Sequence, residues 1–159
     1  MKTINELLGL KKQESEQLST KLNKLLANYQ IFYQNLRGFH WNVKGEKFFE
    51  LHLKFEELYN DAVVKIDEIA ERILTLGGTP MHSFADYLDT AALQTAKDVS
   101  DGQQCMETTL ENLASLVQLE KAILPLAQDA EDEGTITLLS DYISQQEKTI
   151  WMLHSWLSK

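Results

Sequence analysis

The feature that most constrains this fold is an unbroken helical spacing of apolar residues in the first third of the chain. From Leu18 to Val43, apolar side chains recur at alternating intervals of four and three residues. This spacing lines them up on one face of an α-helix, so one long helix is predicted from about Ser15 to Asn42. The stripe consists of Leu18, Leu22, Leu25, Tyr29, Phe32, Leu36, Phe39 and Val43.

Three further helices are predicted from the same kind of spacing. The second covers residues 48–76, where two glycines and a proline end it. The third begins near Asp98 or Ser100, and the fourth opens after Gly134 and extends to Leu157. Because the turn between the first two helices is short, these two must be antiparallel neighbours.

The segment between the second and third helices decides the topology. Residues 77–96 amount to about 20 residues of extended chain, enough to span ~60 Å and therefore the length of a ~40 Å helix. Within it, "SFADYL" at 83–88 has the spacing of a short helix. The predicted fold is all-α, a four-helix bundle with a long crossover that contains a short helix, and residues 1–159 form a single domain.

The composition narrows the class of protein. Two prolines and seven glycines are few for an all-β chain. A formal net charge of -9 disfavours general nucleic-acid binding, which requires an excess of Lys or Arg on some surface. No apolar run reaches membrane-spanning length, and the polar start does not resemble a signal peptide, so we expect a cytoplasmic protein without a membrane partner.

A second face of the second helix carries side chains that can bind a metal. His52 and Glu56 are one helical turn apart, and Asp67 and Glu71 form another such pair. His40 lies about four residues before the turn and His52 about seven after it, so an antiparallel pairing brings the two within roughly one helical turn. The mixed nitrogen and oxygen set suits a divalent first-row metal such as Fe(II).

These ligands cannot meet within one chain. His52 and Asp67 are 15 residues apart on a straight helix, which is ~22 Å along its axis. An antiparallel twofold crossing of a second copy near residue 60 brings the halves together and creates two identical sites. The apolar members of this face, Tyr59, Val63 and Leu74, are then the expected interface.

Other interpretations stay open at this point. Each candidate ligand, taken alone, also fits a surface charge or a capped core histidine. A nucleoid-binding structural protein, in which the carboxylates are only interface charges, is one alternative, and a plain helical oligomer without metal is another. The chain contains no Glu-x-x-His motif, and bundles that bind two metals internally use that motif. Its absence favours a site between subunits.

Two segments of the chain closely resemble the Dps family, the mini-ferritins of the ferritin-like superfamily. They are residues 37–78, "RGFHWNVKGEKFFELHLKFEELYNDAVVKIDEIAERILTLGG", and "EKTIWMLHSWL" near the C-terminus. The resemblance implies a homododecamer built from twofold dimers. It also implies a ferroxidase that oxidises Fe(II), preferably with hydrogen peroxide, stores ferric mineral in the hollow shell and protects DNA. The residues that match the family's inter-subunit iron centre, which holds one or two metals, are His40, His52, Glu56, Asp67 and Glu71.

The resemblance implies further roles. Trp41 matches a tryptophan beside the metal centre, where it acts as a redox-active or shielding group. Acidic threefold pores near the start of the last helix admit iron in this family, although acidic residues also favour a helix N-terminus. Direct DNA binding often uses a Lys-rich tail, and this chain offers only three lysines before its first long helix, so nucleoid association through such a tail is disfavoured. The pore candidates are Asp129, Glu131, Asp132, Glu133, Asp141 and Glu147.

Overall fold

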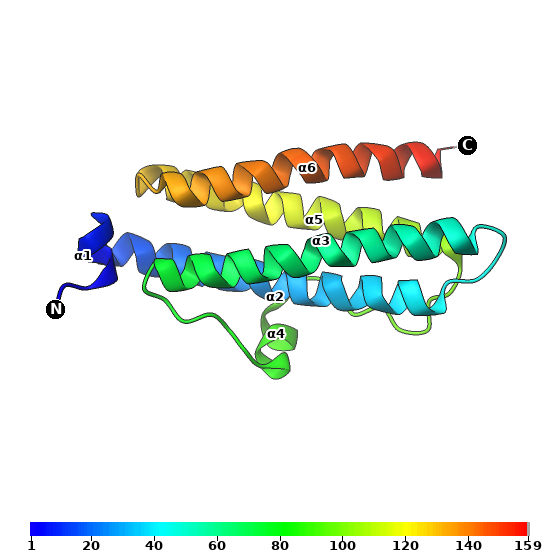
Figure 1. Ribbon diagram of the computed structural model, residues 1–159, viewed down its shortest axis with the longest axis horizontal. Coiled ribbons are helices and arrows are strands. Elements are labelled where there is room, and N and C mark those ends of the chain that lie inside the picture. The colour runs from blue at the N-terminus through cyan, green and yellow to red at the C-terminus, as the bar shows by residue number, and fades with distance from the viewer. Residues whose placement is uncertain (159) are drawn as a thin grey trace.

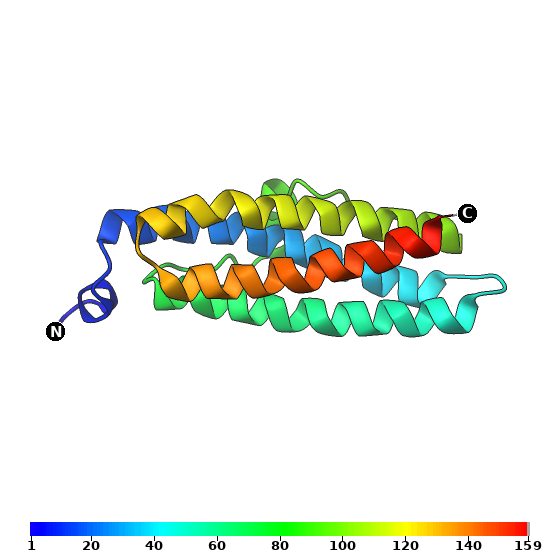
Figure 2. The same ribbon diagram turned by 90° about the horizontal axis from the view of Figure 1, so that it is seen from above.

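Four long antiparallel helices form the body of the protein over residues 1–158, which the structure describes (a computed structural model; Figure 1). Helix α2 packs against α3 and α5, and α5 packs against α6. The turned view shows the long helices side by side along one axis (Figure 2). The helices are α1 (Ile4–Leu8), α2 (Lys12–Asn42), α3 (Phe48–Thr75), α4 (Phe84–Thr90), α5 (Gly102–Asp129) and α6 (Glu133–Leu157).

The connections confirm the predicted topology. Residues 43–47 join α2 to α3 and residues 130–132 join α5 to α6, so each of these pairs is antiparallel. The crossover from α3 to α5 travels from one end of the bundle to the other and carries α4 (Figure 1). Helix α2 begins three residues earlier than predicted, at Lys12. Helix α5 begins at Gly102, later than predicted, because the side chain of Asp101 caps it by accepting from the N–H of Gln104 at 2.9 Å.

Buried asparagines on α2 hold the crossover against the bundle. The side-chain oxygen of Asn28 accepts hydrogen bonds from the backbone N–H groups of residues 92 and 93, both at 2.9 Å. About two turns further along, Asn35 accepts from the N–H of residue 96 at 2.8 Å. These bonds satisfy backbone groups that an irregular segment leaves without helical partners. They fix the path of the crossover along the outer side of α2.

The N-terminal helix α1 was not predicted from apolar spacing. Its ends are defined locally by a capping box between Thr3 and Glu6 and by Gly9, which has a positive φ of 70°. The side chain of Asn5 donates to the backbone oxygen of Leu76 at 3.0 Å. The start of the chain is therefore anchored on the C-terminal end of α3.

A polar cluster lies inside the otherwise apolar bundle. Glu120 on α5 is fully buried, and its carboxylate accepts from the hydroxyl of Tyr29 and from the amide of Gln146, both at 2.7 Å. Burial raises the pKa of Glu120 to about 7, although these two hydrogen bonds and the charge of Lys65 act in the opposite direction. Lys65 is itself buried, and its ammonium donates to Asp61 at 2.5 Å.

Candidate metal centre

The structure brings His40 and His52 into direct contact, as the antiparallel turn predicts. His40 lies in the last turn of α2 and His52 near the start of α3. Their imidazole rings stack with centroids 3.7 Å apart and an interplanar angle of 19°. Phe48 also stacks on His52, with ring centroids 5.2 Å apart, and Tyr59 meets His40 edge to face, also at 5.2 Å. Aromatic neighbours therefore limit the rotation of both rings.

Reciprocal hydrogen bonds fix the proton on each imidazole. Nδ1 of His40 lies 2.8 Å from the backbone oxygen of His52, and Nδ1 of His52 lies 2.8 Å from the backbone oxygen of His40. A carbonyl oxygen can only accept, so Nδ1 is the protonated nitrogen in both rings. When the rings are neutral, each Nε2 keeps a free lone pair and is the atom that can bind a metal.

The three candidate carboxylates have no hydrogen-bond or ion-pair partner for their side chains within residues 1–158. Glu56 is half-buried one turn from His52, whereas Asp67 and Glu71 are exposed further along α3. No group of three or more His, Cys, Asp or Glu side chains in this part of the chain is close enough to hold one metal ion. The two halves of the predicted site are thus separate in a single copy, as the length of α3 requires.

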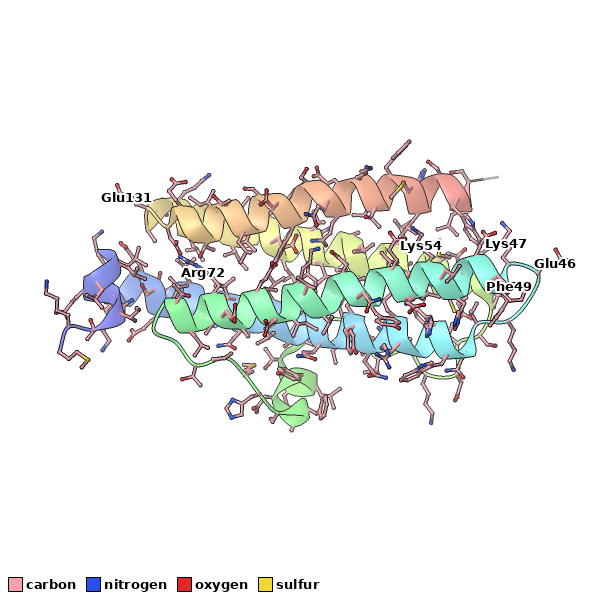
Figure 3. All side chains as sticks on the ribbon, viewed as in Figure 1. Glu46, Lys47, Phe49, Lys54, Arg72 and Glu131 are labelled. Carbon is pink, nitrogen blue, oxygen red and sulfur yellow. The ribbon has the colours of Figure 1, made fainter. Side chains whose placement is uncertain are left out.

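The candidate ligands of α3, which are all of them except His40, lie on one stripe of this helix together with large exposed apolar side chains. At 100° per residue, positions 49 to 74 of this stripe fall within about 100° of the helix circumference. Phe49, Val63 and Leu74 are 80%, 44% and 57% exposed. Figure 3 shows Phe49 near the α2–α3 turn and Arg72 near the opposite end of α3. The stripe contains Phe49, His52, Glu56, Asn60, Val63, Asp67, Glu71 and Leu74.

Trp41 follows His40 and is 57% exposed. Its indole contacts the guanidinium of Arg37, whose central carbon lies 4.7 Å from the ring centroid. The same carbon is 4.7 Å from the ring of Tyr59. A cation thus sits between two aromatic rings at the edge of the histidine pair, a feature that the sequence pattern did not reveal.

The acidic pore candidates differ in whether their carboxylates already have partners within the chain. Asp132 is buried, caps α6 through the N–H of Thr135 and pairs with Arg72, so its carboxylate is already used within the chain. Glu147 pairs with Lys121 at 2.7 Å on the surface of α6. Asp129, Glu131, Glu133 and Asp141 are exposed. The N-terminal cap explains Asp132 fully, whereas the exposed members remain candidates.

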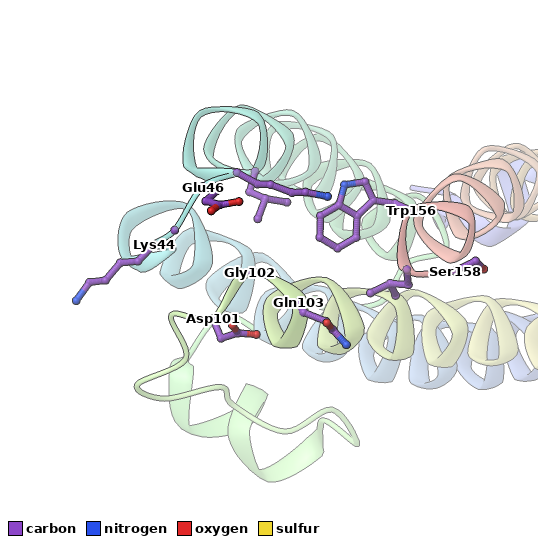
Figure 4. A pocket seen from close by; sticks show the side chains of 11 residues that line it. Lys44, Glu46, Asp101, Gly102, Gln103, Trp156 and Ser158 are labelled. Carbon is purple, nitrogen blue, oxygen red and sulfur yellow. The ribbon is translucent and has the colours of Figure 1, made fainter.

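A cavity of about 370 Å³ opens where the α2–α3 turn, the start of α5 and the end of α6 meet (Figure 4). Its lining includes Glu46, Asp101 and the indole of Trp156, and no histidine. Asp101 is already engaged in capping α5. This cavity therefore does not offer a second metal site.

Comparison with known proteins places this chain in a family. A model of the ferritin-like domain matches residues 19–159. The DNA protection during starvation protein of Porphyromonas gingivalis is 42% identical over the full length of both chains. DNA protection during starvation protein 2 of Bacillus anthracis is 38% identical, covering 91% of this chain and 99% of that one.

Solved structures agree with these relatives. The crystal structure of the DPS protein from Vibrio cholerae O1, described as a member of a superfamily of ferritin-like diiron-carboxylate proteins, covers 99% of both chains with a TM-score of 0.96 and 49% identity. A Dps protein from Bacillus brevis covers 99% of this chain and 100% of its own, with a TM-score of 0.89 and 34% identity. The chain belongs to the Dps family of ferritin-like proteins.

Proposed function

We propose that this protein is a ferroxidase and iron store. Two copies form each metal centre around a twofold axis, with His40, His52 and Glu56 from one copy and Asp67 and Glu71 from the other. Six such dimers build a homododecameric shell that keeps the ferric product. The observation that supports this most directly is the stacked pair His40 and His52, whose Nδ1 atoms are both engaged by carbonyl oxygens, so that each Nε2 is left to bind a metal. Asp67 and Glu71 have no side-chain partner within residues 1–158 and lie too far along α3 to reach this pair in the same copy.

The exposed apolar side chains of the same stripe support the proposal that a second copy of the chain completes the metal centre. Fully burying a side chain such as Phe or Leu contributes about 1.5–3 kcal/mol, and the stripe leaves Phe49, Val63 and Leu74 exposed. An antiparallel crossing near residue 60 covers all three and repeats each contact across the twofold axis. Phe49 of one copy then approaches Leu74 of the other.

The donor set fits Fe(II) as the substrate. Imidazole nitrogens and carboxylate oxygens bind divalent iron, and this number of ligands leaves positions open for an oxidant. Two Fe(II) ions give one electron each to hydrogen peroxide, which takes up two protons and forms two water molecules. The histidines and carboxylates hold and orient the iron, and Trp41 shields one side of the centre. Exposed carboxylates at the α5–α6 turn, Glu131 and Glu133 among them, attract iron towards the shell.

Mixing two inactive variants tests whether the centre lies between subunits. H52A and D67A should each lose the fast phase of Fe(II) oxidation by peroxide, measured by stopped-flow absorbance. If the two are unfolded together and reassembled at equal ratio, half of the dimers are mixed, and each mixed dimer has one intact centre. About 25% of the wild-type amplitude should therefore return.

The matched control is E57A, because Glu57 is an exposed carboxylate on α3 beside Glu56 that lies off the stripe and pairs with Lys54. This variant should oxidise iron like the wild type. A fast phase that persists in unmixed H52A, or a mixture that recovers nothing although it reassembles, contradicts a centre shared between subunits.

A further inference from the structure

Arg37 is a cation without a counter-charge within residues 1–158. It lies one helical turn before His40 on α2, and none of the ion pairs in this part of the chain includes it. One terminal nitrogen, Nη1, donates to the hydroxyl of Tyr33 at 3.0 Å. The Nε atom is enclosed and has no hydrogen-bond partner there. A half-buried guanidinium in this state is stabilised when an anion approaches it.

The guanidinium is held in one place before any anion arrives. Its central carbon lies 4.7 Å from the ring centroids of both Tyr59 and Trp41, and 5.7 Å from that of Tyr33. Stacking on aromatic faces and a hydrogen bond to a phenol restrict a side chain that otherwise has much rotamer freedom. A carboxylate that pairs with it loses less entropy than one that pairs with a mobile arginine.

The twofold contact determines which carboxylate comes near. If His52 faces Asp67 of a second copy, residue 55 faces residue 64 of that copy. Residue 37 of α2 is level with residue 55 of α3 along the bundle axis, because His40 stacks on His52 and the two helices are antiparallel. Side chains on a helix lean towards its N-terminus, so Asp67 leans towards residue 64. The two charged groups therefore approach within about one turn, ~5 Å, along the axis.

Other carboxylates on α3 fit this position less well. Glu71 lies a further turn away along the second copy. Asp61 is already paired with Lys65 of its own chain at 2.5 Å. Asp67 has no partner within its own chain in the described residues, so its two oxygens are available for two different contacts.

We propose that Arg37 is a positioning residue that pairs with Asp67 of the second copy and holds this carboxylate beside the histidine pair. The proposal rests on the twofold centre proposed above. One carboxylate oxygen accepts from the guanidinium and the other is turned towards the metal. The pair also forms in the absence of metal, so it sets the register of the two copies before iron binds.

A double-mutant cycle on the metal-free protein tests the pair directly. In the presence of EDTA, sedimentation velocity at increasing urea gives the midpoint at which the oligomer dissociates. R37Q and D67N should each lower this midpoint, and the double variant should lower it no further than either single change. If the effect of the double variant equals the sum of the two single effects, the pair does not exist.

The control for this cycle is K47Q. Lys47 is also a cation stacked on an aromatic ring, with Nζ 4.2 Å from the ring of Trp156, but it lies away from the stripe. Its replacement should leave the midpoint unchanged. If R37Q does not fold, R37M serves in its place, because methionine keeps the apolar stem that packs on the aromatic rings but removes the charge.

A spectroscopic readout separates positioning from general stability. With Co(II) in place of iron, the visible d–d bands report the geometry around the metal. R37Q should shift these bands and weaken Co(II) binding at least tenfold, R37K should restore part of the affinity, and K47Q should match the wild type. If R37Q has the same bands and the same Co(II) affinity as the wild type, Arg37 does not position the ligand. If the wild-type protein binds no Co(II), the proposed metal centre itself is wrong. In that case the double-mutant cycle on the metal-free protein still tests whether the ion pair forms.

Discussion

At the residue scale, His40 and His52 depend on each other's backbone. Each Nδ1–H donates to the carbonyl of the other residue, so the orientation of one imidazole is set by the position of the other helix. Removing one ring therefore removes a ligand and also loosens the second imidazole, whose stacking partner is lost. We expect H52A to affect metal binding more than the loss of a single ligand would.

Glu120 gives a prediction about pH. Its pKa is raised by burial to about 7 in the folded protein, whereas an unfolded carboxyl titrates near its ordinary value of 4.5. Between these values the folded state binds more protons than the unfolded state, so stability falls as pH rises. E120Q removes this loss and keeps a polar group between Tyr29 and Gln146. The advantage of E120Q over the wild type in thermal unfolding should therefore grow from pH 5 to pH 8.

The measurement is differential scanning calorimetry in EDTA at both pH values, at equal protein concentration. E57Q is the control, because Glu57 is exposed and its replacement should shift both melting temperatures equally. A difference between E120Q and the wild type that is the same at pH 5 and pH 8 contradicts the raised pKa of Glu120.

At the scale of the elements, α2 does more than contribute to the core. One side of it forms the bundle, its end presents His40, and its buried asparagines hold the crossover. N28A leaves two backbone N–H groups of the crossover without their acceptor. Each such loss costs about 1–3 kcal/mol, so N28A should lower the free energy of unfolding by at least this amount. Urea denaturation followed by circular dichroism measures it.

N42A is the comparison for that measurement. Asn42 is exposed at the end of the same helix, and its amide donates only to the backbone oxygen of Gly38 at 2.8 Å. A change of less than about 0.5 kcal/mol is expected for a surface position of this kind. If N28A and N42A lower the free energy of unfolding equally, the hydrogen bonds from Asn28 to the crossover do not contribute to stability.

Apolar spacing predicted the four long helices because each buries one continuous stripe. It missed α1, whose five residues are too few for a stripe and are instead defined by the Thr3 capping box and the contact of Asn5 with α3. Gln146 was visible as the single break in the stripe of α6, but its partner Glu120 is known only once α5 and α6 are packed together. The position of Arg37 between two aromatic rings depends likewise on the register of α2 against α3.

At the scale of the whole molecule, the N-terminus bears on the alternative function, direct binding to DNA. The first helix is fixed to the end of α3, and Lys11 and Lys12 pair with Glu14 and Glu16. Together with the net charge of -9, this leaves few cations free to contact phosphates. The protein should not retard duplex DNA in a gel at near-physiological salt, and strong retardation there contradicts the charge argument.

The proposed shell gives a prediction about size and iron content. Light scattering should report a particle of about twelve subunits, and after loading with Fe(II) and peroxide the purified particle should retain many irons per subunit. A small oligomer without retained iron favours a plain helical assembly instead. No helix within residues 1–158 is both long and apolar enough to cross a membrane.

The separation of the two half-sites along α3 determines when iron chemistry can begin. A newly made subunit carries two half-sites, and on the proposed function neither is competent alone, so the chain is inert towards iron and peroxide until it finds a second copy. Iron oxidation then starts only where subunits are assembling into the shell that keeps the ferric product. At low subunit concentration the activity per chain should fall with dilution, because assembly itself switches the enzyme on.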